Sequence, residues 1–199
     1  MIERAFFSCA DRARYIYLIQ WARLGVEARG GLVVLGVRLM ELYHGSYVRV
    51  PEPKIVHSAH FLDFGMGFYT TTDKEQAIKF TDKFTDLGKD RIVNMYEYDK
   101  TGAEEALSIL RYPSADTKWL RYVAANRMGR GKDGDFDIVA GPVANDRVFN
   151  VVRFFEVGVY SEEDAIKRFL TFRLTDQIAF KTEKSLGYLK YTGSEKIAE

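Results

Sequence analysis

Apolar and polar residues alternate, or recur at helical spacing, along most of the chain after residue 40. Runs of alternating, β-prone residues predict short strands. Apolar stripes that follow a capping residue predict helices. The predicted strands cover 42–44, 68–71, 91–98, 107–112, 136–140 and 178–181, and the predicted helices cover 73–87, 117–127 and 161–170. Because strands and helices mix without a regular βαβ rhythm, the pattern favours an α+β domain.

The first predicted helix carries the clearest local signals. Thr72 or Asp73 is placed to cap its start, and Gly88 is placed to end it. Its expected buried stripe consists of Ala77, Phe80, Thr81 and Phe84.

Three later segments are less decided. Gly-Pro at 141–142 predicts a turn after a buried strand. Residues 143–155 read as a loop followed by a helix or a strand, and residues 185–191 read as a helix turn or a strand.

Composition divides the chain into three parts. Residues 1–39 combine a candidate helix at 11–25 with a glycine-rich stretch and a short apolar run, and Met40 then precedes the first motif. We expect the protein to start at Met40, which would make 1–39 an over-extended reading of the gene. The alternative is a genuine N-terminal extension that packs on the domain. Residues 40–192 form the predicted domain, and 193–199 a polar, flexible tail.

The composition of the 199 residues suits an ordinary globular domain. A net charge of +1 gives no reason to expect bulk electrostatic binding to nucleic acid, although a local basic patch stays open. One cysteine excludes a disulfide framework. No segment has the roughly 18–20 apolar residues that a membrane span needs. Because a clean secretory signal is also missing, we expect a cytoplasmic protein with no membrane partner.

The histidines stand at 44, 57 and 60. His57 and His60 have a spacing that a metal pair could use, but no second ligand cluster follows them. We therefore expect these two on a loop surface, and we expect no metal site.

Two short motifs carry the candidate chemistry. Leu-Tyr-His-Gly-Ser at 42–46 places His44 at a strand end, before two residues small enough to admit a ligand. His44 can donate to a sugar hydroxyl, Gly45 offers open backbone groups and Ser46 adds a hydroxyl. Phe-Gly-Met-Gly-Phe-Tyr at 64–69 ends in Tyr69, whose ring can stack on a flat ligand. Taken singly, His44 is more often a satisfied turn histidine and Tyr69 a core aromatic.

Together the two motifs resemble the nicotinamide pocket of ADP-ribosyltransferases of the poly(ADP-ribose) polymerase type. That superfamily has a split β-sheet with surrounding helices and a His–Tyr–Glu triad. The resemblance implies that NAD is bound as a substrate, with His44 on a ribose hydroxyl and Tyr69 stacked on the nicotinamide ring. Gly45 and Ser46 would hold the nicotinamide amide. The residues to which it assigns NAD contacts in these motifs are His44, Gly45, Ser46, Gly67, Phe68 and Tyr69.

The third member of the triad is ambiguous in this chain. The best match to the family's late strand is Asp-Gln-Ile-Ala-Phe at 176–180, which places Gln177 where the family has glutamate. A glutamine can hold a hydroxyl, but it cannot supply the negative charge that stabilises an oxocarbenium-like transition state. Glu183 is the rival, and on an extended strand it would lie roughly 20 Å from Gln177. Gln177 is the preferred candidate.

Most of residues 40–191 also resemble a bacterial family of uncharacterised proteins placed in this superfamily. Besides the two motifs, the match covers Ala-Asn-Arg at 125–127, Asp-Ile-Val at 137–139, Gly-Pro-Val-Ala-Asn-Asp at 141–146 and Thr-Glu at 182–183. Several relatives sit beside a small partner gene, which implies a toxin–antitoxin or phage-defence system with a small antitoxin protein as partner.

Arg127 and Asn145 are the remaining candidates for NAD contact. Arg127 could meet the NAD diphosphate, but a salt bridge at the end of its helix is the alternative. Asn145 follows a buried strand and could border the NAD or acceptor site, or it could close a self-satisfied Asx turn.

The sequence therefore predicts a mono-ADP-ribosyltransferase that moves ADP-ribose from NAD to a protein or nucleic-acid acceptor and releases nicotinamide. Two alternatives stay open: an NAD glycohydrolase, and an inactive domain that binds NAD or a partner. Gln177 keeps the inactive alternative open.

Overall fold

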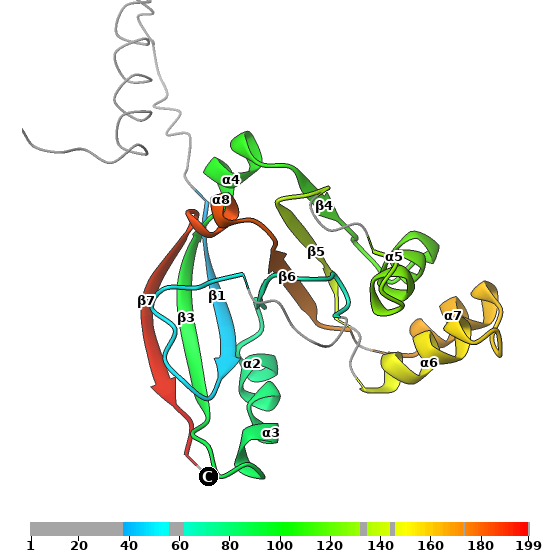
Figure 1. Ribbon diagram of the computed structural model, residues 1–199, viewed down its shortest axis with the longest axis horizontal. Helices are drawn as coiled ribbons and strands as arrows, with labels where there is room; N and C mark the ends of the chain where they lie inside the picture. The colour runs from blue at the N-terminus through cyan, green and yellow to red at the C-terminus, as the bar shows by residue number, and fades with distance from the viewer. Residues whose placement is uncertain (1–37, 56–61, 132–134, 144–145, 173, 199) are drawn as a thin grey trace, which may run out of the picture. The chain divides into compact units, whose positions relative to one another are not determined.

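The protein is described here by a computed structural model that covers residues 38–55, 62–131, 135–143, 146–172 and 174–198, with only the backbone at 146–147. The predicted α+β class is confirmed, since strands form two sheets and helices lie beside both (Figure 1). The strands are β1 (Leu39–Ser46), β2 (Phe68–Thr70), β3 (Ile92–Asp99), β4 (Ile109–Arg111), β5 (Ile138–Pro142), β6 (Asp176–Phe180) and β7 (Leu189–Lys196). The helices are α2 (Lys74–Phe80), α3 (Asp82–Thr85), α4 (Lys100–Ala106), α5 (Thr117–Arg127), α6 (Asp146–Glu156), α7 (Glu162–Phe169) and α8 (Glu183–Leu186).

The two sheets meet at one backbone bridge. The first sheet has the order β1-β3-β7 and the second the order β2-β6-β5-β4. All pairs are antiparallel except β4 with β5. Tyr43 in β1 and Thr71 after β2 exchange both backbone hydrogen bonds, at 2.9 and 3.0 Å. Beyond this bridge the edges of β1 and β2 separate.

Two apolar clusters hold these layers together. One lies between the sheets and contains Leu42, Phe68, Tyr96 and Phe180. The other packs α5, α6 and α7 against the second sheet, around the fully buried Trp119. Side chains alternate along β6, so that Ile178 and Phe180 enter the first cluster and Ala179 enters the second. The alternation places Gln177 on the same side of β6 as Ala179.

Helix α2 begins as predicted but ends early. The Asp73 side chain caps it by accepting from the backbone N–H groups of Glu75 and Gln76. The expected burial of Phe80 is wrong, because its side chain is 52% exposed. Thr81 takes the inward position instead, and its hydroxyl donates to the Ile78 carbonyl at 2.6 Å, where the chain turns into α3.

Several boundaries differ from the expectations or resolve them. Residues 141–142 continue β5 instead of turning, because Gly141 and Pro142 pair with β6. The prediction of a flexible tail is wrong for residues 193–196, because β7 runs to Lys196 and pairs with β3. The undecided segment 143–155 contains α6, and 185–191 contains both the end of α8 and the start of β7.

The expectations for the N-terminal part fall mainly outside the described residues. These are the helix at 11–25, most of the apolar run and the question of an extension before Met40. Strand β1 begins at Leu39, and Leu39 pairs with Asp99. In the described part of the chain, every helix is too short or too polar to span a bilayer.

Gly45 permits α2 to lie directly against the end of β1. A Cβ atom at this position would meet the Ala77 carbonyl oxygen at 2.5 Å, as well as the side chains of Thr81 and Phe80. That approach is closer than real Cβ atoms tolerate, and the carbonyl belongs to helix backbone that cannot swing away. The glycine therefore sets the distance between β1 and α2.

We expect Gly45→Ala to lower the free energy of unfolding by roughly 1–3 kcal/mol, since the added methyl overpacks the β1–α2 contact. Ser46→Ala is the matched control, because it changes the next residue without adding volume. Its loss should stay within about 1.5 kcal/mol, the value of one hydrogen bond. Urea unfolding measures both variants. Equal losses would contradict the packing role of Gly45.

Candidate functional site

A cavity of about 720 Å³ opens where β1 and β2 separate. Its wall is largely apolar, and residues from β1, the following loop, β2, α2 and β6 contribute to it. The candidate residues that line it are His44, Gly45, Ser46, Gly67, Phe68, Tyr69 and Gln177. The fold therefore brings together, on one cavity, residues that lie more than a hundred positions apart in the sequence.

His44 is held in one ring orientation. Its Nδ1 lies 2.7 Å from the Tyr69 carbonyl oxygen, which can only accept, so Nδ1 carries the proton. Its ring packs on Phe68, with the centroids 4.4 Å apart. Burial lowers the pKa of His44 below its ordinary value of 6.5, and the Lys83 charge lowers it further against the Tyr69 bond. His44 is therefore a neutral imidazole whose Nε2 is an acceptor.

Gly45 presents backbone groups to the opening between the sheets. Successive residues of a strand direct their N–H and C=O groups to alternate edges. Tyr43 uses both of its groups on Thr71, so those of Gly45, two residues later, point to the same edge of β1. The bridge between the strands has ended there, and a ligand can take both groups.

The loop after Ser46 is fastened to the sheet by Asn94. The Asn94 side chain, fully buried in β3, accepts from Val50 N at 2.8 Å and donates to the Val48 carbonyl at 3.1 Å. The Tyr96 hydroxyl donates to the Val50 carbonyl at 2.6 Å. Asn94 was not a candidate from the sequence, although a polar residue among the alternating apolar residues of a predicted strand was a usable signal.

The Tyr69 ring is fixed by the turn that precedes it. Its hydroxyl donates to the Gly65 carbonyl at 2.6 Å and accepts from Phe64 N at 3.1 Å. Gly65 has a φ of 78°, which closes the turn back to Leu62. Tyr69 pairs with Ala179 of β6, so its ring lies on the same side of the second sheet as Gln177.

Gln177 is buried, and its amide nitrogen is fully used. Nε2 donates to Asp63 Oδ2 at 2.9 Å and to the Pro142 carbonyl at 3.2 Å. Asp63, which also lines the cavity, was not a candidate from the sequence. Its position directly before the Phe-Gly-Met-Gly-Phe-Tyr motif gave no hint that it would pair with Gln177, 114 positions later.

Arg127 forms an ion pair instead of lining the cavity. Its Nε donates to Asp63 Oδ1 at 2.8 Å, and its Nη2 contacts the same oxygen. Its guanidinium also lies 4.6 Å above the centre of the Phe149 ring. This is the salt bridge that the sequence left open as the alternative, and it fixes Asp63 beside Gln177.

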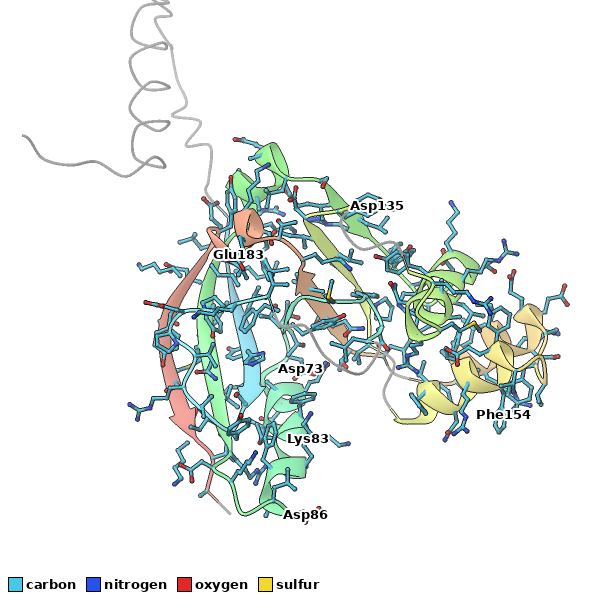
Figure 2. The ribbon with its side chains drawn as sticks, viewed as in Figure 1. Asp73, Lys83, Asp86, Asp135, Phe154 and Glu183 are labelled. Atoms are coloured by element: carbon cyan, nitrogen blue, oxygen red, sulfur yellow. The ribbon has the colours of Figure 1, made fainter. Side chains whose placement is uncertain are left out.

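Glu183 lies outside the cavity. It is the first residue of α8, it is exposed, and it stands at the α4–α8 end of the domain (Figure 2). Asp73, the N-cap of α2, and Lys83 in α3 lie well away from it in the same view. Of the two candidates for the third triad position, Gln177 is therefore the one at the cavity.

The other candidates fall on undescribed positions. Asn145, His57 and His60 lie outside the described residues. Within the described ranges, no group of three or more His, Cys, Asp or Glu side chains is arranged to hold a metal ion.

A second, smaller cavity of about 370 Å³ adjoins β5 and β6. It is lined by Tyr98, Lys100 and Arg111 among others, and Gln177 is common to both cavities. Glu104 pairs with Arg111 at 2.7 Å and lies 3.9 Å from Lys100, so the cationic groups at this cavity are already partly neutralised.

A family model described as "protein of unknown function (DUF3990)" matches residues 40–191, and the chain therefore belongs to that family. No curated protein and no solved structure gives a significant match.

We expect NMR titration to give His44 a pKa below 6.5, with Nδ1 protonated, because burial disfavours the imidazolium. The unfolded chain then takes up the proton first as the pH falls below 6.5, so this site makes the protein less stable toward acid. His44→Gln assigns the resonance. A measured pKa at or above 6.5 would contradict the described environment.

Proposed function

We propose that this member of the DUF3990 family binds NAD in the larger cavity and transfers its ADP-ribose group to a macromolecule. The observation that carries the proposal is the meeting of His44, Tyr69 and Gln177, from three different strands, on one cavity. The sequence motifs that contain these three residues resemble the NAD-binding motifs of ADP-ribosyltransferases. They are far apart in the chain, and a shared ligand would explain why they meet at one cavity. A cavity of about 720 Å³ also falls in the usual range for small-molecule sites.

The nicotinamide end of NAD fits the part of the cavity wall that Gly45 and Tyr69 form. A carboxamide has one donor group and one acceptor, and the N–H and C=O of Gly45 are complementary to that pair. The Tyr69 ring offers a stacking surface whose orientation the Gly65 turn already holds. A pocket that is fixed before binding orders the ligand at a lower entropic cost.

The ribose next to nicotinamide fits between His44 and Gln177. The neutral His44 Nε2 accepts a hydrogen bond from a ribose hydroxyl. In transfer, the bond between C1′ and the nicotinamide nitrogen breaks, and nicotinamide leaves as a neutral molecule with the bonding electron pair. An acceptor atom bonds to C1′ and loses its proton to solvent. The residues hold the dinucleotide for this displacement and exclude water from it.

The arrangement of strands supports an ADP-ribosyltransferase-like fold as part of the same proposal. Such a fold has a split sheet, and here β1 and β2 share a single bridge before they part. The proposed ligand lies where they part, with the last contributing residue on β6.

NAD hydrolysis without an acceptor is the second candidate function, and an NAD-binding domain without chemistry is the third. Gln177 favours the third candidate only, because an amide adds no negative charge near the oxocarbenium-like state that transfer and hydrolysis share. In transfer, the acceptor would be a protein or a nucleic acid.

The direct experiment is to incubate the full chain with NAD labelled in its adenylate part and with cell lysate. Label on macromolecules supports transfer. Release of free ADP-ribose alone supports hydrolysis. If neither product forms while NAD still binds, the domain is inactive.

We expect His44→Ala and Tyr69→Ala to abolish nicotinamide release, since one removes the ribose contact and the other the stacking surface. Gln177→Ala should lower it by at least tenfold, the equivalent of about 1.4 kcal/mol in the transition state. Glu183→Ala is the matched control and should keep wild-type activity, because Glu183 is exposed and outside the cavity. Full activity of the His44 and Tyr69 variants, or loss with Glu183→Ala, would contradict the site.

A further inference from the structure

Two acceptors converge on the Gln177 amide nitrogen. Asp63 Oδ2 lies 2.9 Å and the Pro142 carbonyl oxygen 3.2 Å from Nε2. Neither oxygen has a proton to give when Asp63 is ionised, so both bonds need hydrogens from residue 177. Only an –NH₂ group supplies two. These partners assign the amide orientation and require glutamine at this position.

The opposite end of the same amide is open. Among the described residues, Gln177 Oε1 has no hydrogen-bond partner. The polar side-chain atoms that are both unpaired and fully enclosed do not include it, so this oxygen is accessible. Gln177 lines the larger cavity as well as the smaller one, so a donor group of a bound molecule can reach this oxygen.

Asp63 is itself fixed on its other side. Arg127 donates Nε and Nη2 to Oδ1, and Gln177 donates to the other oxygen, Oδ2. The ion pair is buried, with side-chain exposures of 12% for Arg127 and 9% for Asp63. Glu156 and Lys181 are charged groups near this pair. Burial raises the pKa of Glu156, and the charges of Arg127 and Arg153 oppose that rise. Lys181 Nζ donates to the carbonyl of Phe64, the residue after Asp63.

We propose that Asp63 is a positioning residue that, held by Arg127, turns the Gln177 amide so that its oxygen faces the ribose hydroxyls of NAD. This assignment rests on the proposed function for the identity of the ligand. It explains why glutamine stands where the related enzymes have glutamate: a glutamate would set a second carboxylate against Asp63. The negative charge in this part of the site lies on Asp63, which accepts a hydrogen bond from Gln177.

A single-atom change isolates the role of Asp63. In Asp63→Asn, Arg127 retains the oxygen, so the new –NH₂ group occupies the place of Oδ2 and faces the Gln177 –NH₂ group. Two donors then oppose each other, and the Gln177 amide must turn over or lose its partner. In Asp63→Asn/Gln177→Glu the asparagine donates to the new carboxylate, and the charge moves from residue 63 to residue 177.

The experiment is a double-mutant cycle on the full chain with wild type, Asp63→Asn, Gln177→Glu and the double variant. We expect each single variant to lower kcat/KM for NAD consumption about tenfold or more, as expected for one unsatisfied buried hydrogen bond. The double variant should have a higher kcat/KM than either single variant but stay below wild type, because the Pro142 carbonyl still lacks its donor. Gln177→Glu is thus harmful in the wild-type background and beneficial in the Asp63→Asn background. An equal effect of Gln177→Glu in both backgrounds would overturn the proposal.

Thermal unfolding of the same four proteins gives a readout that does not need NAD. Each single variant should lower Tm by roughly 2–4 °C. The double variant should lose less than the sum of the two, because it restores the hydrogen bond between residues 63 and 177 but not the one to the Pro142 carbonyl. Additive Tm changes would overturn the pairing of Asp63 with Gln177. If either single variant does not fold, recovery of folding in the double variant supports the pairing, and failure of the double variant to fold overturns it.

The pH dependence separates charge repulsion from a loss of packing. In Gln177→Glu two adjacent carboxylates share a site, which raises the folded-state pKa of the pair. The Tm deficit should therefore shrink between pH 8 and pH 5 in Gln177→Glu, and it should change less in the double variant, which holds only one carboxylate at these two positions. A deficit independent of pH in both would overturn the proposal.

The two readouts also distinguish this inference from the proposed function. Coupled Tm values without NAD turnover in any protein support the pairing and count against ADP-ribose transfer or hydrolysis. Turnover by wild type with additive Tm values supports the NAD activity and overturns the role of Asp63.

Discussion

The bridge between Tyr43 and Thr71 is the contact on which the candidate site depends. It is the place where β1 and β2 are held by backbone hydrogen bonds, at 2.9 and 3.0 Å, and the strands part immediately afterwards. One residue further, His44 Nδ1 reaches the Tyr69 carbonyl across the widening gap. The bridge thus fixes the spacing of the two motifs, and the cavity is the space left where the bridge stops.

Packing around that cavity limits how much the motifs can move. Gly45 lets α2 touch the end of β1, and Asn94 fastens the loop that follows Ser46. The Tyr69 hydroxyl holds the Gly65 turn from the other side. Several separate contacts therefore hold the residues that line the cavity, and each contact involves a different part of the fold. Such a preformed site favours a rigid, flat ligand group.

Local signals in the sequence predicted the elements better than the contacts between them. The Asp73 cap and the alternation of β3 follow from residues near in sequence, and both are confirmed. Phe80 and the tail at 193–196 were misjudged, because a helix interruption at Thr81 and pairing of β7 with β3 decided them. Asp63 and Gln177 are 114 residues apart, and the periodicity of apolar residues cannot predict a contact between such distant positions.

The central claim is that the nicotinamide end of NAD occupies the cavity between β1 and β2. A crystal structure of the full chain with a non-hydrolysable NAD analogue tests it directly. We expect an aromatic ring stacked on Tyr69, its carboxamide on the Gly45 backbone and a ribose hydroxyl on the Gln177 oxygen. A dinucleotide bound instead at the smaller cavity beside Tyr98 and Arg111, or none bound at millimolar concentration, would contradict it.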